Sequence, residues 1–116
     1  MSLEAAVRSI RDSGVPAVAV VSREGTVLAA DMPLGVSRET FSIMCATIHG
    51  AGMTVSSEIR RSMPRRVIID SQEGRIVISE AGRRALVVLV LSGDADVDAV
   101  AAKVEPFLAQ IAREAR

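Results

Sequence analysis

Cys45 and His49 are the two residues of this chain whose types and spacing could do chemistry. They stand four positions apart in a segment with helical periodicity, so one lies a turn above the other. Such a pair could supply two zinc ligands, and an antiparallel helix dimer could bring two pairs together. It could equally be a thiol nucleophile with its base. Because no third residue at a readable spacing would orient His49, we predict that both side chains serve packing, with no catalytic residue and no metal site.

The turn glycines do not form a nucleotide-binding motif. Gly25, Gly74 and Gly82 each stand alone between two apolar runs, which is typical of separate hairpin turns. No G-x-G-x-x-G motif follows a strand and opens a helix, and no Walker sequence occurs. The sequence therefore predicts no cofactor and a protein that is not an enzyme.

Two further glycines interrupt the segment that carries Cys45 and His49. Gly50 and Gly52 cost a helix roughly 2 kcal/mol relative to alanine, and something should offset that cost. Small residues allow close approach of the protein's own sheet or of a second helix. We expect both, with packing inside one chain as the alternative. On this helix the predicted homodimer interface consists of Gly50, Gly52, Met53, Val55 and Ile59.

Four arginines surround the end of the same segment. Arg60, Arg61, Arg65 and Arg66 complement the negative end of a helix dipole, and a solvated face is one interpretation of such a cluster. The other is contact with an acidic partner, and we predict these four residues as the partner-binding site.

The element that must position all these residues is a long helix predicted over residues 37–63. Ser37 can cap its first turn, and Pro64 disfavours helical conformation at the preceding residue. At 1.5 Å per residue it would span roughly 40 Å, more than a domain of this size easily covers. Its apolar stripe comprises Phe41, Met44, Cys45, Ile48, Gly52, Val55 and Ile59. Of these we expect Phe41, Met44, Ile48 and Val55 to face a sheet.

The composition indicates one globular domain over residues 1–116. The chain is 49% hydrophobic but only 2% aromatic, and its 14 basic and 14 acidic residues cancel. Neutral charge argues against a nucleic-acid partner, and no apolar run reaches the length of a membrane span. A single Cys cannot form an internal disulfide, which fits a reducing compartment, so we expect a cytoplasmic protein.

The rest of the chain supplies a sheet and two more helices. A short helix should run from Leu3 to before Gly14, and a final helix from about Val97. Pro106 removes a hydrogen bond of that final helix and should kink it near residues 102–105. Apolar runs separated by short turns predict antiparallel strands over residues 17–21, 26–30, 66–70, 75–79 and 85–91. The predicted fold class is α+β, a five-stranded antiparallel sheet with helices on its faces.

The order of these elements resembles a known family. The run from Gly14 to Ala29, with its apolar strand and its Glu24-Gly25 turn, is similar to the opening of the roadblock/dynein light-chain domain. The likeness continues through the small-residue-rich helix, the Gly74 hairpin, the strand over residues 85–91 and the closing helix. It covers essentially the whole chain, but it contains no catalytic signature.

The resemblance implies a profilin-like sandwich and a homodimer in which the long helices and the first strand of the second hairpin meet their twins. This strand adds Val67, Ile68 and Ile69 to the predicted homodimer interface. Members of the family bind and regulate small Ras-like GTPases or serve as scaffold subunits, and short stand-alone members are common in prokaryotes. We therefore expect a non-enzymatic homodimeric regulator or scaffold for a small Ras-like GTPase. The alternatives are a small-molecule sensor, which would need a cavity near Ala17, Ala19 and Gly52, and a purely structural dimerisation module.

Overall fold

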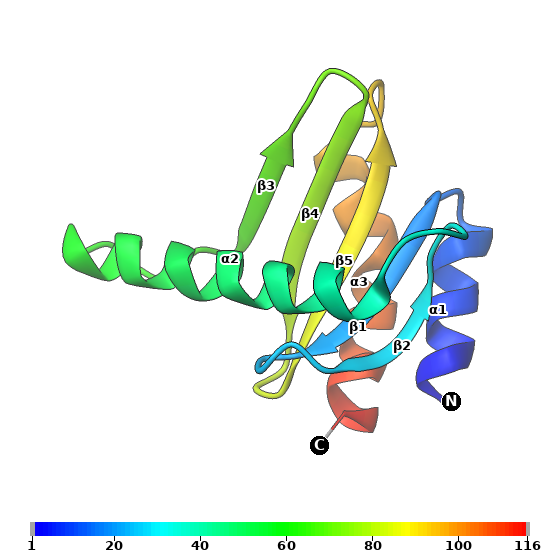
Figure 1. The fold of residues 1–116 in the computed structure, drawn as a ribbon, viewed down its shortest axis with the longest axis horizontal. Coiled ribbons are helices and arrows are strands. Elements are labelled where there is room, and N and C mark those ends of the chain that lie inside the picture. The colour runs from blue at the N-terminus through cyan, green and yellow to red at the C-terminus, as the bar shows by residue number, and fades with distance from the viewer. Residues whose placement is uncertain (1, 116) are drawn as a thin grey trace.

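In a computed structural model that describes residues 2–115, the chain forms three helices and five strands. Their order is the one predicted from the sequence (Figure 1). The elements are α1 (Leu3–Asp12), β1 (Ala17–Ser22), β2 (Val27–Asp31), α2 (Arg38–Glu58), β3 (Arg66–Asp70), β4 (Gly74–Ala81), β5 (Ala85–Ser92) and α3 (Val97–Glu114).

All five strands join one antiparallel sheet in the order β2-β1-β5-β4-β3. The strand that is apolar along its whole length, β5, takes the central position, where both of its faces are covered. The helix α2 connects β2 with β3, and these two strands form the two edges of the sheet. Each chain therefore has two open sheet edges, at opposite ends of the sheet.

The helices form layers on both faces of the sheet (Figure 1). On one face α1 and α3 lie side by side, and Ile10, Val104 and Ile111 from these helices are fully buried against the sheet. On the other face α2 lies alone and contributes Cys45 to a second, smaller core. The α+β class and the five-stranded antiparallel sheet are thus confirmed.

Side-chain caps fix where the three helices begin. Ser2, Ser37 and Asp96 each accept a hydrogen bond from a backbone N–H in the first turn of their helix. Near the other end of the chain, α3 continues through Pro106 as one helix to Glu114, so the proline predicted to kink it does not end it.

The end of α2 differs from the prediction. We expected the helix to reach Met63, but it ends at Glu58, with Ile59 as its C-cap. Arg60 adopts φ 58°, its N–H donates to the Ser57 carbonyl, and the Arg61 N–H donates to the Ser56 carbonyl. This is a Schellman motif with an arginine where glycine is usual. The backbone closes the helix itself, several residues before Pro64 can act.

Candidate interaction surface

The face of α2 that lies on the sheet is narrow and largely polar. Its buried side chains are Ser42, Cys45 and His49, while Met44 and Val55, which we predicted to face the sheet, are 50% and 63% exposed. The predicted orientation of those two residues is therefore wrong. Cys45 packs in the apolar second core, and this burial raises the pKa of its thiol to about 11.

The apolar residues of α2 fall into two stripes instead of one. Successive residues turn by about 100° around a helix, so Cys45, His49 and Gly52 share the sheet side. Met44, Val55 and Ile59 lie along one flank of α2 and remain exposed, with Ile48 half-buried between them. This flank carries no charge, because the sequence holds no Asp, Glu, Lys or Arg between Glu39 and Glu58.

The outward side of α2 is also unusually apolar for a surface helix. The hydroxyls of Thr47 and Thr54 donate to the carbonyls of Ile43 and Gly50 within the helix, at 2.8 and 3.2 Å. Both threonines thereby satisfy their polar atoms internally. A solvent-exposed helix normally has charged residues on this side, so α2 presents an unusually uncharged surface.

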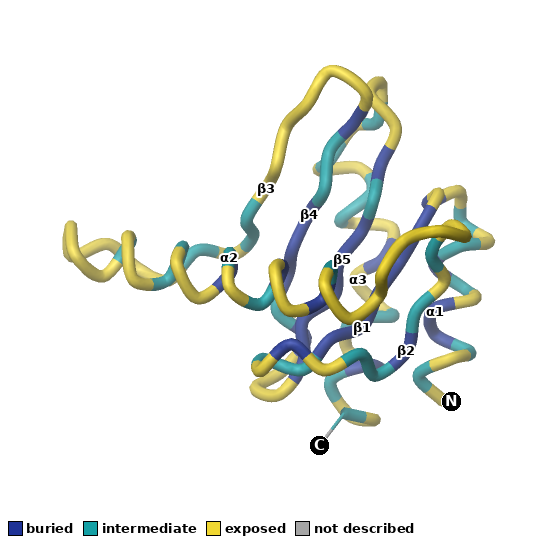
Figure 2. The backbone as a smooth tube through the Cα atoms, in the orientation of Figure 1, coloured by how far each residue is buried: buried dark blue, intermediate teal, exposed yellow. Residues whose placement is uncertain are grey.

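The second half of α2 extends past the edge strand β3, where it forms a corner with the sheet (Figure 2). Gly52 makes this possible, since a Cβ atom there would lie 3.1 Å from Val67 Cγ2 of β3. Gly50 has no neighbour within 4 Å of such an atom and leaves that side of the helix open. On β3 itself Ile68 and Ile69 are 45% and 36% exposed.

We use the name α2–β3 surface for the exposed apolar residues of this corner, which are Val55, Ile59 and Ile69. Ile68 pairs with Val77 of the core beneath α1 and α3, so its side chain points to the other face of the sheet. Of the other residues predicted for a homodimer interface, Met53, Gly52 and Val67 are half-buried and Gly50 is exposed. The structure thus places the second half of α2 next to β3, whereas Gly50 and Ile68 point away from the corner between them, and the homodimer interface stays a prediction.

Three of the four predicted partner-binding arginines are available for a partner. Arg60, Arg61 and Arg65 are exposed and, within residues 2–115, make no side-chain hydrogen bond or ion pair. Arg66 is half-buried, and its Nη2 lies 3.1 Å from Asp98 Oδ1 of α3. The basic end of α2 therefore consists of Arg60, Arg61 and Arg65.

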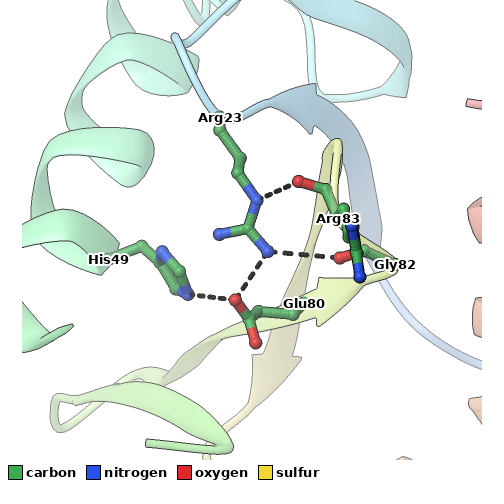
Figure 3. A network of polar contacts seen from close by, with 5 residues as sticks. All are labelled: Arg23, His49, Glu80, Gly82 and Arg83. Atoms are coloured by element: carbon green, nitrogen blue, oxygen red, sulfur yellow. Dashed lines mark hydrogen bonds and ion pairs between the residues drawn. The ribbon is translucent and has the colours of Figure 1, made fainter. Parts of the chain in front are cut away.

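A polar network that the sequence did not reveal ties α2 to two hairpin turns (Figure 3). Arg23 Nη2 lies 2.6 Å from Glu80 Oε2, and Arg23 also donates to the carbonyls of Gly82 and Arg83. His49 Nε2 lies 3.6 Å from the same Glu80 oxygen. Burial lowers the pKa of His49, Glu80 opposes this shift, and Arg23 adds to it.

This network links residues that are far apart in the sequence, so no local spacing could have identified it. Neither Cys45 nor any other nucleophile takes part, and we assign it a structural role. In the part of the chain that the structure describes, no three His, Cys, Asp or Glu side chains gather as metal ligands would. No helix in the described region combines the length and the apolar character that crossing a membrane requires.

The surface hollows are open and shallow. One of about 390 Å³ lies between α3 and the β3–β4 side of the sheet, and it is lined by residues that include Arg65, Arg66 and Leu108. The hollows that we identify on the described surface are not lined by Ala17, Ala19 or Gly52. Gly52, one of the positions where a small-molecule sensor would need a cavity, is closely packed against Val67, which counts against that alternative.

Comparison with known proteins agrees with this architecture. MJ0714 of Methanocaldococcus jannaschii is 34% identical over 79 residues, which cover 68% of this chain and 67% of that protein. A solved structure described as MglB with tetrameric arrangement has a TM-score of 0.83 at 20% identity, covering 97% of this chain and 87% of that one. Acanthamoeba castellanii profilin II has a TM-score of 0.70 at 15% identity, over 97% and 98% of the two chains, which supports the profilin-like description.

The model of one protein family matches most of the chain. It describes the Roadblock/LC7 domain and matches residues 1–92, from α1 through β5. The predicted resemblance is confirmed, and the chain belongs to the Roadblock/LC7 family.

Proposed function

We propose that this protein is a non-enzymatic homodimeric regulator or scaffold that binds a small Ras-like GTPase. The observation that carries the proposal is the α2–β3 surface, an exposed and uncharged helix flank beside an unpaired strand edge. Large exposed apolar patches on globular proteins are normally covered by another chain. An unpaired edge strand likewise invites pairing.

A second copy of the chain fits this surface. In a twofold contact β3 would pair with β3 of the twin, and each α2 would lie against the other beside that joined edge. Ala51, which lies beside Val55 around the helix, leaves room for helices to approach closely because its side chain is a single methyl group. The fold neighbour described as MglB with tetrameric arrangement supports self-association in this family.

The GTPase is proposed from the family and from charge. The roadblock family, to which the chain belongs, includes regulators and scaffolds of small Ras-like GTPases. The exposed Arg60, Arg61 and Arg65 would attract an acidic surface of such a partner and speed its association. Regulation would then consist of binding one conformation of the GTPase switch loops better than the other.

The direct test is nucleotide hydrolysis by a small GTPase of the same organism, measured with and without this protein. Binding is measured in parallel with the GTPase loaded with GDP and with a non-hydrolysable GTP analogue. Preferential binding of one nucleotide state supports a regulator, and binding of both without a change in hydrolysis supports a scaffold. No binding to any small GTPase of that organism would refute the proposal and favour a structural dimerisation module.

A variant of the basic end tests in the same assay whether its arginines bind the GTPase. Replacing Arg60, Arg61 and Arg65 with serine should weaken GTPase binding and reduce its dependence on salt, because long-range attraction between exposed charges is screened. Serine at Arg83 and Arg84, two exposed arginines in the β4–β5 turn, is the matched control. The cytoplasmic location inferred from the single cysteine stays a prediction, which fractionation of the cells would test.

A further inference from the structure

A second exposed apolar feature precedes α2, well away from β3. Pro33, Leu34, Gly35 and Val36 form a turn in which the Val36 N–H donates to the Pro33 carbonyl. Gly35 supplies the positive φ, 88°, that a type II turn requires at its third position. The turn holds Leu34 fully exposed at its tip, with Val36 39% exposed behind it. Leu34 is thus an apolar knob on a defined turn.

A hollow with an apolar wall lies between the first turns of α2 and the start of β2, whereas the knob follows the end of β2. It has a volume of about 340 Å³, and Val27 of the edge strand β2 and Ile43 of α2 supply its apolar side chains. Gly25 shapes it, because the turn between β1 and β2 approaches α2 so closely that a Cβ at Gly25 would lie 2.9 Å from Ile43 Cα. Glu39 stands at its rim.

Opposite charges flank the knob and the hollow. Arg38 and Glu39 are adjacent and exposed, and within the described region neither forms a side-chain ion pair. In a twofold contact, where each surface meets its own copy, Arg38 of one chain would face Glu39 of the other. The basic end of α2 offers no such balance, because Arg60, Arg61 and Arg65 would repel their own copies.

We propose that this region is a second self-association surface, occupied by another copy of the chain. Leu34 of each copy enters the hollow formed by Val27 and Ile43 of the other, and Arg38 pairs with Glu39 across the contact. We name this region the knob–hollow surface and define it by Val27, Leu34, Arg38, Glu39 and Ile43.

The occupant is a copy of this chain because the region supplies both halves of the contact. It presents an apolar projection and an apolar recess, and it presents a cation next to an anion. It also lies at the β2 end of the sheet, opposite the α2–β3 surface, so both surfaces can be occupied at once. Two different twofold contacts on one chain join dimers into tetramers or longer assemblies. A tetrameric arrangement is described for the MglB fold neighbour.

Sedimentation velocity over a concentration series tests the proposal. We expect wild-type assemblies of four or more chains, and Leu34→Ser should reduce them to two chains. Each twofold contact loses two buried leucines, so the dissociation constant between dimers should rise at least about a hundredfold. Since Leu34 touches no core residue, the thermal melt of the variant should match that of the wild type.

A charge reversal tests the pairing itself. Arg38→Glu should weaken the assembly, and combining it with Glu39→Arg should restore it, because the exchanged pair recreates the same contact. Arg113→Glu, an equal change of charge at an exposed position of α3 on the other face of the sheet, is the control and should have no effect. Failure of the double variant to recover would refute the Arg38–Glu39 pairing.

The outcomes separate this contact from the dimer proposed above. Suppose that the wild type is a dimer, that Leu34→Ser converts it to a monomer and that Val55→Glu leaves it intact. This result would support the knob–hollow surface and refute the α2–β3 dimer. A wild-type protein that never exceeds two chains and keeps its mass with Leu34→Ser would overturn the inference. A wild-type tetramer whose number of chains is unchanged by Leu34→Ser would overturn the inference as well.

Discussion

Val55 gives the most direct test of the α2–β3 surface. It lies on the uncharged flank of α2 and is 63% exposed in the single chain. Val55→Ala removes two methyl groups from each copy, and each buried methyl contributes about 0.8 kcal/mol. Four methyl groups per dimer, scaled by that exposed fraction, amount to about 2 kcal/mol, or a dissociation constant about thirtyfold higher.

Val55→Glu should have a larger effect, because it places two like charges in an apolar contact with no partner for either. We expect this variant to be monomeric at concentrations where the wild type is dimeric. The assay is sedimentation velocity over a dilution series in a background of Leu34→Ser, so that only the α2–β3 contact is measured. A thermal melt of each variant shows whether the fold is kept.

Ser57→Glu is the matched control for that variant. Ser57 is exposed two residues further along α2, on the opposite flank, so the same charge is added without touching the proposed contact. A Val55→Glu variant that dimerises as tightly as the Ser57→Glu variant would show that the interface lies elsewhere. A wild type that is monomeric at high concentration would refute the contact altogether.

Three further predictions concern single residues of α2 and of the cap that follows it. Arg60→Gly should raise the free energy of unfolding by about 0.5–1 kcal/mol in a urea titration, because glycine adopts the positive φ of this cap without strain; no gain would contradict the assigned cap. The buried His49 has a pKa below 6.5, so the unfolded chain binds the extra proton first, and stability should fall as pH drops from about 7 to about 5.5. His49→Gln should flatten that pH dependence, and an unchanged slope would assign it to other groups. Cys45, whose thiol pKa is about 11, should react with a thiol reagent at about pH 8 far more slowly in the folded protein than in urea.

Local patterns predicted most of the secondary structure. The strand expected over residues 66–70 is β3 to the residue, and the other strands agree within one or two residues at each end. The reason is that strand alternation and turn chemistry are short-range: Gly25 and Gly82 adopt positive φ in the turns where they were placed. The starts of α1 and α2 also depend on short-range contacts, since the side chains of Ser2 and Ser37 each accept a hydrogen bond from the first turn of their own helix.

The orientation of α2 could not be predicted in the same way. A helix is normally assigned its solvent side by its charged residues, and α2 has none between Glu39 and Glu58. Residues such as Met44 and Val55 therefore looked equally suited to the core and to the surface. The orientation of α2 is set by the sheet, which ends at β3 and packs only against the side of the helix that carries Cys45 and His49.

The network around Glu80 escaped prediction for a different reason. Arg23 and Glu80 are separated by 57 positions, and nothing in either local sequence indicates the other. They meet only because β1 and β4 both flank β5, which brings the β1–β2 turn next to the end of β4. Long-range polar contacts of this kind follow from strand order, which the sequence pattern did not specify.

The composition of the second half of α2 is itself an argument for a partner. From Gly50 to the C-cap no residue is buried, and two glycines in that stretch disfavour a helix by roughly 2 kcal/mol. Short helices without tertiary support are marginal in water. Within one chain, this stretch is supported by the contact of Gly52 with Val67 and by the backbone cap at Arg60. A second chain packed on Val55 and Ile59 would supply the burial that this stretch lacks within one chain, and would offset the cost of the two glycines.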